Sequence, residues 1–290
     1  MMKLPNWLRI AVAFAAVFAV VVGTGSDAVA ADEAIAFGKE MFKLNLGYYR
    51  PNFDSRVAVG VTGGSPPGDI NPEQDLGLDN SLGGARFDGY WRFADRHRLY
   101  LGYYQLDRSA SRVLDRDIGP INIPGHGDLT INAGSNINTE AKWEVFILGY
   151  DYSFHKTDTV EIAGMIGLNV AELGTKLSGT LITPVGTITD STAGSTITAP
   201  LPAIGFSGDW AIDDSWRMRG HAGGFKIKIN NIDANVVDAS VAGEYRVYGN
   251  IWGGLGYSLL NASAKKDESG SNASLDWRTG GWQLYGSMLF

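Results

Sequence analysis

Period-two alternation of side chains recurs along the sequence after residue 40, and it limits the folds that the chain can adopt. Apolar residues or glycines occupy every second position at residues 85–93, 160–170 and 204–212. Successive side chains of a β-strand point to opposite faces, so this pattern predicts strands and no long amphipathic helix. The intervening positions often carry charge, as at Arg86 and Asp88. Strands of this kind suit a barrel whose outer face meets lipid and whose inner face is polar.

The lengths of the connections support the same fold. We predict ten strands, with approximate spans 41–50, 82–94, 98–108, 142–154, 158–174, 200–212, 215–228, 236–248, 251–263 and 279–290. Tight turns are expected at residues 94–97, 155–157, 213–214 and 249–250. Mostly long loops are expected at residues 51–81, 109–141, 175–199, 229–235 and 264–279. Short turns at one end and long loops at the other are typical of outer-membrane barrels, in which the short turns are periplasmic. The sequence therefore predicts an all-β, transmembrane, antiparallel up-and-down β-barrel over residues 41–290, with eight strands as the alternative if residues 215–248 form loop hairpins.

The N-terminus has the three parts of a secretory signal peptide. Lys3 and Arg9 precede an apolar run at residues 10–22, and Ala28-Val29-Ala30 supplies a small-x-small cleavage site. The apolar run is shorter than the ~20 residues that a membrane-spanning helix needs. We therefore expect residues 1–30 to be removed and residues 31–40 to form a short periplasmic N-terminus.

Composition excludes some classes of partner. The chain has no cysteine, which is compatible with an oxidising compartment, and its formal net charge is −7. An acidic chain of this kind is not expected to bind nucleic acid. We expect lipid and lipopolysaccharide of the outer membrane as its surroundings, no cofactor, and an extracellular ligand whose identity the sequence does not reveal.

The C-terminal residues carry a resemblance to a known class of proteins. The chain ends in Phe290, and the same face of the last predicted strand carries Trp282, Leu284 and Met288. This resembles the C-terminal signature by which the barrel-assembly machinery recognises outer-membrane proteins of Gram-negative bacteria. The resemblance implies that these four residues form the assembly signal.

A wider resemblance covers most of the mature chain. Its features are the acidic segment at residues 75–79, the strand at residues 96–104, the Ala-Pro-Leu-Pro segment at residues 199–202 and a closing glycine-aromatic hairpin. The chain is similar in these features to uncharacterised proteobacterial outer-membrane β-barrel proteins. That resemblance implies the fold and the location, and it brings no known activity.

A polar network is predicted inside the barrel. If the apolar faces meet lipid, the inward face receives Lys43, Arg86, Asp88, Arg92, Asp151, Glu161, Asp209, Arg217, Arg219, His221, Glu244 and Arg246. Charges of both signs in a narrow space of low dielectric should pair, and Asp209 with Arg217 is the expected pair beside one tight turn. Ten strands lie nearer to the filled barrels of eight strands than to the open channels of sixteen. The network is therefore expected to fill the lumen, with a narrow path for small solutes as the alternative.

Aromatic residues cluster beside the four short turns and predict an interfacial girdle. The residues concerned are Trp91, Phe93, Phe154, Trp210, Trp216, Tyr248 and Trp252. Amphipathic rings suit the boundary between lipid and water. Trp143 and Tyr257 are candidates for the opposite belt.

Catalytic and metal-binding patterns are weak. Of the four histidines, only His221 is predicted at membrane depth, and no serine or aspartate stands beside it in a recognisable pattern. Residues 69–80 begin like a calcium-binding loop but have Gln74 where glycine is needed and Asn80 where an acidic residue is needed. We therefore expect a non-enzymatic surface or structural barrel with porin-like architecture, no catalytic residues and no metal site. The alternatives are a narrow channel and an outer-membrane hydrolase using His221.

Overall fold

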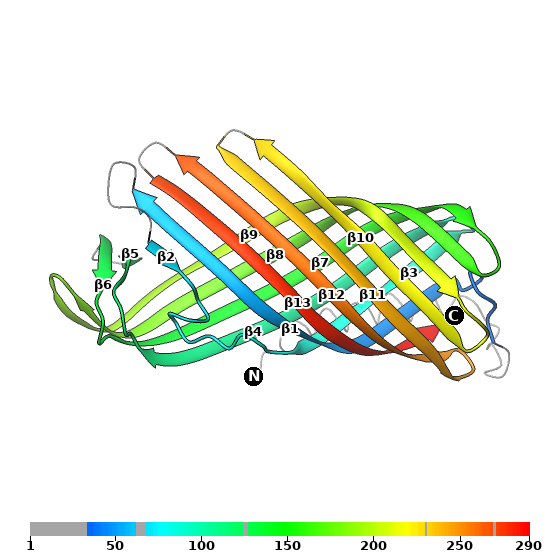
Figure 1. Cartoon of the computed structure of the whole chain (residues 1–290), viewed down its shortest axis with the longest axis horizontal. Helices are drawn as coiled ribbons and strands as arrows, with labels where there is room; N and C mark the ends of the chain where they lie inside the picture. The colour runs from blue at the N-terminus through cyan, green and yellow to red at the C-terminus, as the bar shows by residue number, and fades with distance from the viewer. Residues whose placement is uncertain (1–33, 62–67, 124–126, 230, 269–270) are drawn as a thin grey trace, which may run out of the picture. The chain divides into compact units, whose positions relative to one another are not determined.

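Ten long strands pair with their neighbours in chain order and close into one antiparallel barrel (Figure 1). The barrel strands are β1 (Phe42–Val61), β3 (Gly84–Ala94), β4 (His97–Val113), β7 (Asn136–Lys156), β8 (Val160–Thr183), β9 (Gly186–Ala211), β10 (Trp216–Ile229), β11 (Ile232–Tyr248), β12 (Ile251–Glu268) and β13 (Ser271–Leu289). Closure comes from β13 pairing with β1, from Lys43 opposite Leu289 to Val61 opposite Ser271. The prediction of ten strands is confirmed, and the eight-stranded alternative is wrong because β10 and β11 are barrel strands.

This computed structural model describes residues 34–61, 68–123, 127–229, 231–268 and 271–290. Residues Ile35–Phe290 form a unit by themselves. The predicted signal peptide, residues 1–30, lies outside the described residues. No helix in the described part of the chain is long and apolar enough to cross a membrane.

An apolar band surrounds the barrel next to its short turns. Large side chains in this band point away from the barrel, and Ile166, Ile204 and Leu284 expose 61%, 66% and 65% of their surface. The outward positions become polar further along the longer strands, as at Arg50 in β1 and Glu172 in β8. Apolar surface of this extent is unfavourable in water, so the band marks the part of the barrel that lies in lipid.

The other ends of the strands rise well beyond this band. The hairpin of β8 and β9 is paired up to Thr183 opposite Gly186, and β12 and β13 are paired up to Glu268 opposite Ser271. The predicted loops at residues 229–235 and 264–279 are therefore corrected to strand extensions, with β10 and β11 paired up to Ile229 opposite Ile232. The predicted loop at 175–199 is a long hairpin as well. We call this end of the barrel the hairpin end and the other the short-turn end.

Smaller elements add to the hairpin end. β2 (Gly68–Ile70) pairs with β1, and β5 (Ile118–Ile123) pairs with β6 (Gly127–Ile131) in a separate two-stranded sheet. These elements lie within the predicted loops 51–81 and 109–141. Leu114, Ile118, Ile131, Ile137 and Leu181 pack together there in a second hydrophobic cluster.

The aromatic residues divide between the outside and the inside of the barrel. Trp91, Phe93 and Phe154 expose 44%, 47% and 51% of their surface beside the short turns, where a girdle was predicted. Trp252 exposes only 2% and Trp143 only 9%, so both point into the barrel and neither belongs to an interfacial belt. Trp252 lies two residues before Gly254, and Trp143 lies two residues before Val145. Each tryptophan therefore shares the inward face of its strand with that residue.

Candidate functional site

The inside of the barrel holds an ion-pair layer near the short-turn end. At one side, Lys43 on β1 donates hydrogen bonds to both carboxylate oxygens of Glu244 on β11, each at 2.7 Å. At another, Arg92 on β3 donates to Glu161 on β8 at 2.7 and 2.8 Å and to Glu40 at 3.2 Å. All five side chains are almost completely buried. The layer therefore joins strands that are not neighbours in the barrel.

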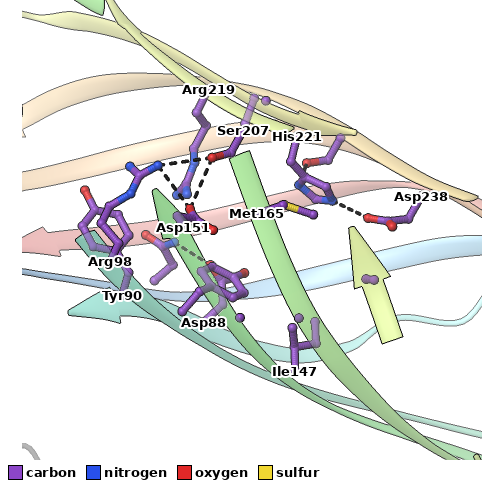
Figure 2. A pocket seen from close by; sticks show the side chains of 18 of the residues that line it. Asp88, Tyr90, Arg98, Ile147, Asp151, Met165, Ser207, Arg219, His221 and Asp238 are labelled. Carbon is purple, nitrogen blue, oxygen red and sulfur yellow. Dashed lines mark hydrogen bonds and ion pairs between the residues drawn. The ribbon is translucent and has the colours of Figure 1, made fainter. Parts of the chain in front are cut away.

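Arg98 on β4 is the centre of this layer. Its guanidinium group contacts Asp209 at 2.9 Å, Asp151 at 3.2 Å and Glu161 at 3.7 Å, and only 2% of its side chain is exposed. Arg219 reaches Asp209 at 3.8 Å. Figure 2 shows Arg98, Asp151 and Arg219 converging on one side of the cavity. A buried arginine of this kind is stable only when several carboxylates surround it.

The structure places the twelve predicted lumen residues on the inward face. Nine of them form ion pairs of the layer: Lys43, Arg86, Asp88, Arg92, Asp151, Glu161, Asp209, Arg219 and Glu244. The predicted pair of Asp209 with Arg217 is corrected. Asp209 pairs with Arg98, whereas the Arg217 guanidinium lies over the Trp252 ring at 4.2 Å. Arg246 lies over the same ring at 5.0 Å.

Sequence reasoning missed several residues of the layer. Glu40 was assigned to a periplasmic tail, but it is 3% exposed and pairs with Arg92. The adjoining N-terminal segment also lies at the barrel, because Ile35 N–H donates to the Asn250 side chain at 2.9 Å. Arg98 stood at the predicted edge of its strand, although its alternation with Tyr100 and Tyr104 was a signal for the inward face.

A cavity of about 140 Å³ lies beside the ion-pair layer. One part of its wall is apolar, with Ile147, Met165 and Ala203, and another part is polar, with Arg219 and Gln283. Figure 2 shows His221 and Asp238 facing each other at this cavity. The cavity therefore offers both apolar and hydrogen-bonding surface to a small molecule.

His221 stands in a hydrogen-bonded chain on this wall. Its Nε2 atom is 2.7 Å from Asp238 Oδ2, and its Nδ1 atom is 2.8 Å from Ser240 Oγ. The sequence offered His221 alone, and the structure adds two partners from the neighbouring strand β11. The signal that could have found them is the register of a tight β10–β11 hairpin, which sets His221 directly opposite Ser240.

An aromatic cluster fills the lumen on the hairpin side of the cavity. Tyr49, Phe53, Leu106, Trp143, Val145 and Trp277 form its buried core. The rings of Trp143 and Trp277 are 4.4 Å apart at their centroids, and the Arg108 guanidinium lies 4.0 Å from the centroid of Phe53. The lumen is therefore occupied at two levels, first by the ion-pair layer and then by the aromatic cluster.

The acidic segment near the hairpin end is held by arginines. Glu73 accepts a hydrogen bond from Arg108 at 2.7 Å, and Asp75 accepts from Arg116 at 2.7 Å. These hydrogen bonds from Arg116 hold the pKa of Asp75 below its ordinary value of 3.8. Asp75 is only 8% exposed, although it lies in the long loop predicted at residues 51–81. The described residues contain no group of three or more carboxylates or imidazoles placed to hold a metal ion.

Comparisons with known proteins concern the fold alone. Neither a protein-family model nor a curated protein matches the sequence. The crystal structure of the outer membrane protease OmpT from Escherichia coli is similar, with a TM-score of 0.52 and 11% identity, covering 90% of this chain and 100% of that one. The Yersinia pestis attachment invasion locus protein Ail, in complex with sucrose octasulfate, has a TM-score of 0.31 and 10% identity, with coverages of 83% and 97%. The outer membrane protein OprG from Pseudomonas aeruginosa has a TM-score of 0.33 and 10% identity, with coverages of 90% and 98%.

The chain has the fold of an outer-membrane β-barrel. The likeness to OmpT extends over the whole of that protein, and at this identity it carries the architecture and no activity.

Proposed function

We propose that this protein is an outer-membrane surface barrel with a closed lumen, oriented with its short turns in the periplasm and its hairpin end outside the cell. The observation that carries the proposal is the occupation of the lumen at two levels. The ion-pair layer joins β1, β3, β4, β8 and β11, and the aromatic cluster joins β1, β4, β7 and β13. Ions could cross the lumen only if both the ion-pair layer and the aromatic cluster were opened.

The hairpin end is the part of the barrel that we expect to act outside the cell. On β8, Thr183 at the tip is the 13th residue after Val170, which lies at the edge of the apolar band. At ~3.3 Å per residue this is roughly 40 Å of strand beyond the lipid. The paired strands form a rigid scaffold for the connections at this end, and connections held in this way commonly carry binding.

Electrical recording tests the closed lumen. Refolded mature chain inserted into a planar lipid bilayer should give no persistent current steps. Sustained conductance by the wild-type protein would refute the closed lumen and favour the narrow-channel alternative.

Labelling of intact cells tests the orientation. The chain has no cysteine, so single substitutions give unambiguous sites. Val185→Cys lies at the tip of the β8–β9 hairpin, where Val185 is 72% exposed, and should react with a membrane-impermeant maleimide. Asp214→Cys, in the exposed short turn between β9 and β10, is the matched control and should react only after the cells are broken. The opposite labelling pattern would reverse the orientation.

A further inference from the structure

The lumen cavity contains three residues whose arrangement matches a nucleophile, a base and an orienting acid. His221 on β10 is the register partner of Ser240 on β11, and Asp238 precedes Ser240 by two residues on the same face. All three line the cavity. A single hairpin therefore fixes the positions of all three residues.

We propose that Ser240 is a nucleophile activated by His221 and Asp238, and that the cavity accepts small carboxylic esters for acyl transfer to Ser240. This goes beyond the proposed surface function and departs from the sequence-based expectation of a non-enzymatic barrel.

One tautomer of His221 satisfies both of its contacts. With the proton on Nε2, the ring donates to Asp238 Oδ2 at 2.7 Å, and Nδ1 is then free to accept the Ser240 hydroxyl proton at 2.8 Å. In most serine hydrolases Nε2 faces the serine and Nδ1 faces the acid. The two nitrogens exchange these roles here, but the chemistry needs only one acceptor and one donor on opposite sides of the ring.

The contacts of Asp238 favour its role as the acid that orients His221. Within the described residues its only ion-pair partner is His221. Its negative charge therefore stabilises the imidazolium that forms when His221 takes the serine proton. Asp238 acts through His221 and is a positioning residue.

The cavity sets the size and chemistry of the substrate. A cavity of about 140 Å³ is close to the ~150 Å³ that holds a benzene molecule in a protein interior. Ile147, Met165 and Ala203 give an apolar wall for a short acyl chain. Gln283 is 8% exposed and its side chain makes no hydrogen bond with the described residues, so its amide N–H groups are available to the carbonyl oxygen. These features select small uncharged esters over lipids or peptides.

The reaction that follows from this geometry is balanced without any further reactant except water. Ser240 Oγ attacks the ester carbonyl carbon while its proton passes to His221 Nδ1. The bond to the alcohol oxygen then breaks, and that oxygen takes the proton from His221. Water hydrolyses the acyl-serine by the same route and restores Ser240.

Covalent labelling tests the nucleophile. Folded protein in detergent micelles would be treated with methanesulfonyl fluoride, which is small enough for the cavity and transfers its sulfonyl group to activated serines with release of fluoride. Peptide mass spectrometry should find one methanesulfonyl group, on Ser240. The matched control is Ser258 on β12, which is paired in register with Ser240 and whose buried Oγ has no hydrogen-bond partner among the described residues.

The variants separate activation from simple accessibility. Ser240→Ala should abolish labelling, and Ser258→Ala should leave it unchanged. His221→Gln and Asp238→Asn should each slow labelling of Ser240 by about 100-fold, a typical contribution of a general base. Heat-modifiable mobility on gels establishes that each variant is folded, and having two activating variants keeps the test valid if one fails to fold.

Ester turnover provides the second readout. Wild-type protein should release methanol from methyl acetate, followed by NMR, and Ser240→Ala should not. No adduct on the folded wild type, equal labelling of Ser258, a rate that does not depend on His221 and Asp238, or labelling without Ser240-dependent release of methanol would each overturn the proposal. A neutral ester has to pass only one of the two levels, whereas an ion has to pass both, so absence of ionic current is compatible with a positive result.

Discussion

Charges inside the barrel are compensated residue by residue. Arg98 has three carboxylates around it, and Arg92 has two. Moving such groups out of water is costly, and the cost is recovered only if each charge keeps its partner. Single substitutions that remove one partner should therefore have large effects on stability.

Glu161→Gln tests this at one residue. The carboxylate of Glu161 accepts two hydrogen bonds from Arg92, and an amide can accept only one of them. We expect the free energy of unfolding, from urea titration in lipid vesicles, to fall by about 3 kcal/mol. The control Asp158→Asn, in an exposed short turn, should change it by less than about 0.5 kcal/mol. Equal effects of the two variants would show that the ion-pair layer does not stabilise the barrel.

The ion pair of Asp75 with Arg116 predicts a pH dependence outside the membrane. Because its folded pKa lies below 3.8, Asp75 contributes stability that is present above this value and is lost as the pH falls through the folded pKa. Amide hydrogen exchange of residues 71–80 should thus stay slow from pH 7 to about pH 4 and accelerate, beyond the intrinsic rate, only at lower pH. Asp75→Asn should remove this protection at every pH, whereas Asp79→Asn, at an exposed position, should not. Early loss of protection near pH 5 in the wild type would contradict the assignment.

At the scale of strands, each element has two parts with different environments. β9 has 26 residues, whereas about 9 to 11 residues cross a membrane. The part next to the short turn has an apolar outward face, and the remainder is rich in threonine, serine and glycine. The first part should determine membrane insertion, and the second should be dispensable for it.

Shortening the β8–β9 hairpin tests this division. Replacing residues 178–192 by Asn-Gly would join Leu177 to its register partner Ala193. We expect the shortened chain to keep heat-modifiable mobility, because the lipid-facing positions remain. It loses Leu181 from the second hydrophobic cluster, so trypsin should cleave faster at Arg112 and Arg116. Failure of the shortened chain to fold would show that the extension is part of the folding unit.

The division of each strand into a lipid-facing part and an extended part explains how much of the fold could be predicted from the sequence. Alternation found ten strands because lipid on one side and polar groups on the other impose a period of two. Beyond the lipid both faces are polar, and the pattern disappears, so residues 264–279 looked like a loop although residues 264–268 belong to β12 and residues 271–279 to β13. Alternation also predicted which charged side chains point inward. It could not predict their ion-pair partners, because these depend on the register of the strands and on side chains that reach across the lumen. Asp209 and Arg217 flank one turn, yet Arg217 lies over the Trp252 ring. Asp209 forms its ion pair with Arg98.

For the whole molecule, the two levels of the lumen act as barriers in series. The ion-pair layer lies near the short-turn end, and the aromatic cluster lies on the far side of the cavity. A series arrangement means that opening one level leaves the other closed. Ions should therefore cross the barrel only when both levels are opened, and opening either level alone should leave it non-conducting.

Variants at Arg98 and Trp143 test this arrangement. Arg98→Ala removes the centre of the ion-pair layer, and Trp143→Ala removes the ring that packs on Trp277. Each single variant should remain silent in planar bilayers, and the double variant should give discrete current steps, provided that heat-modifiable mobility shows folded barrels. Current through Arg98→Ala alone would mean that the aromatic cluster is no barrier, and current through Trp143→Ala alone would mean the same for the ion-pair layer. A silent, folded double variant would place the closure elsewhere, at the N-terminal segment around Glu40 or at the hairpin end.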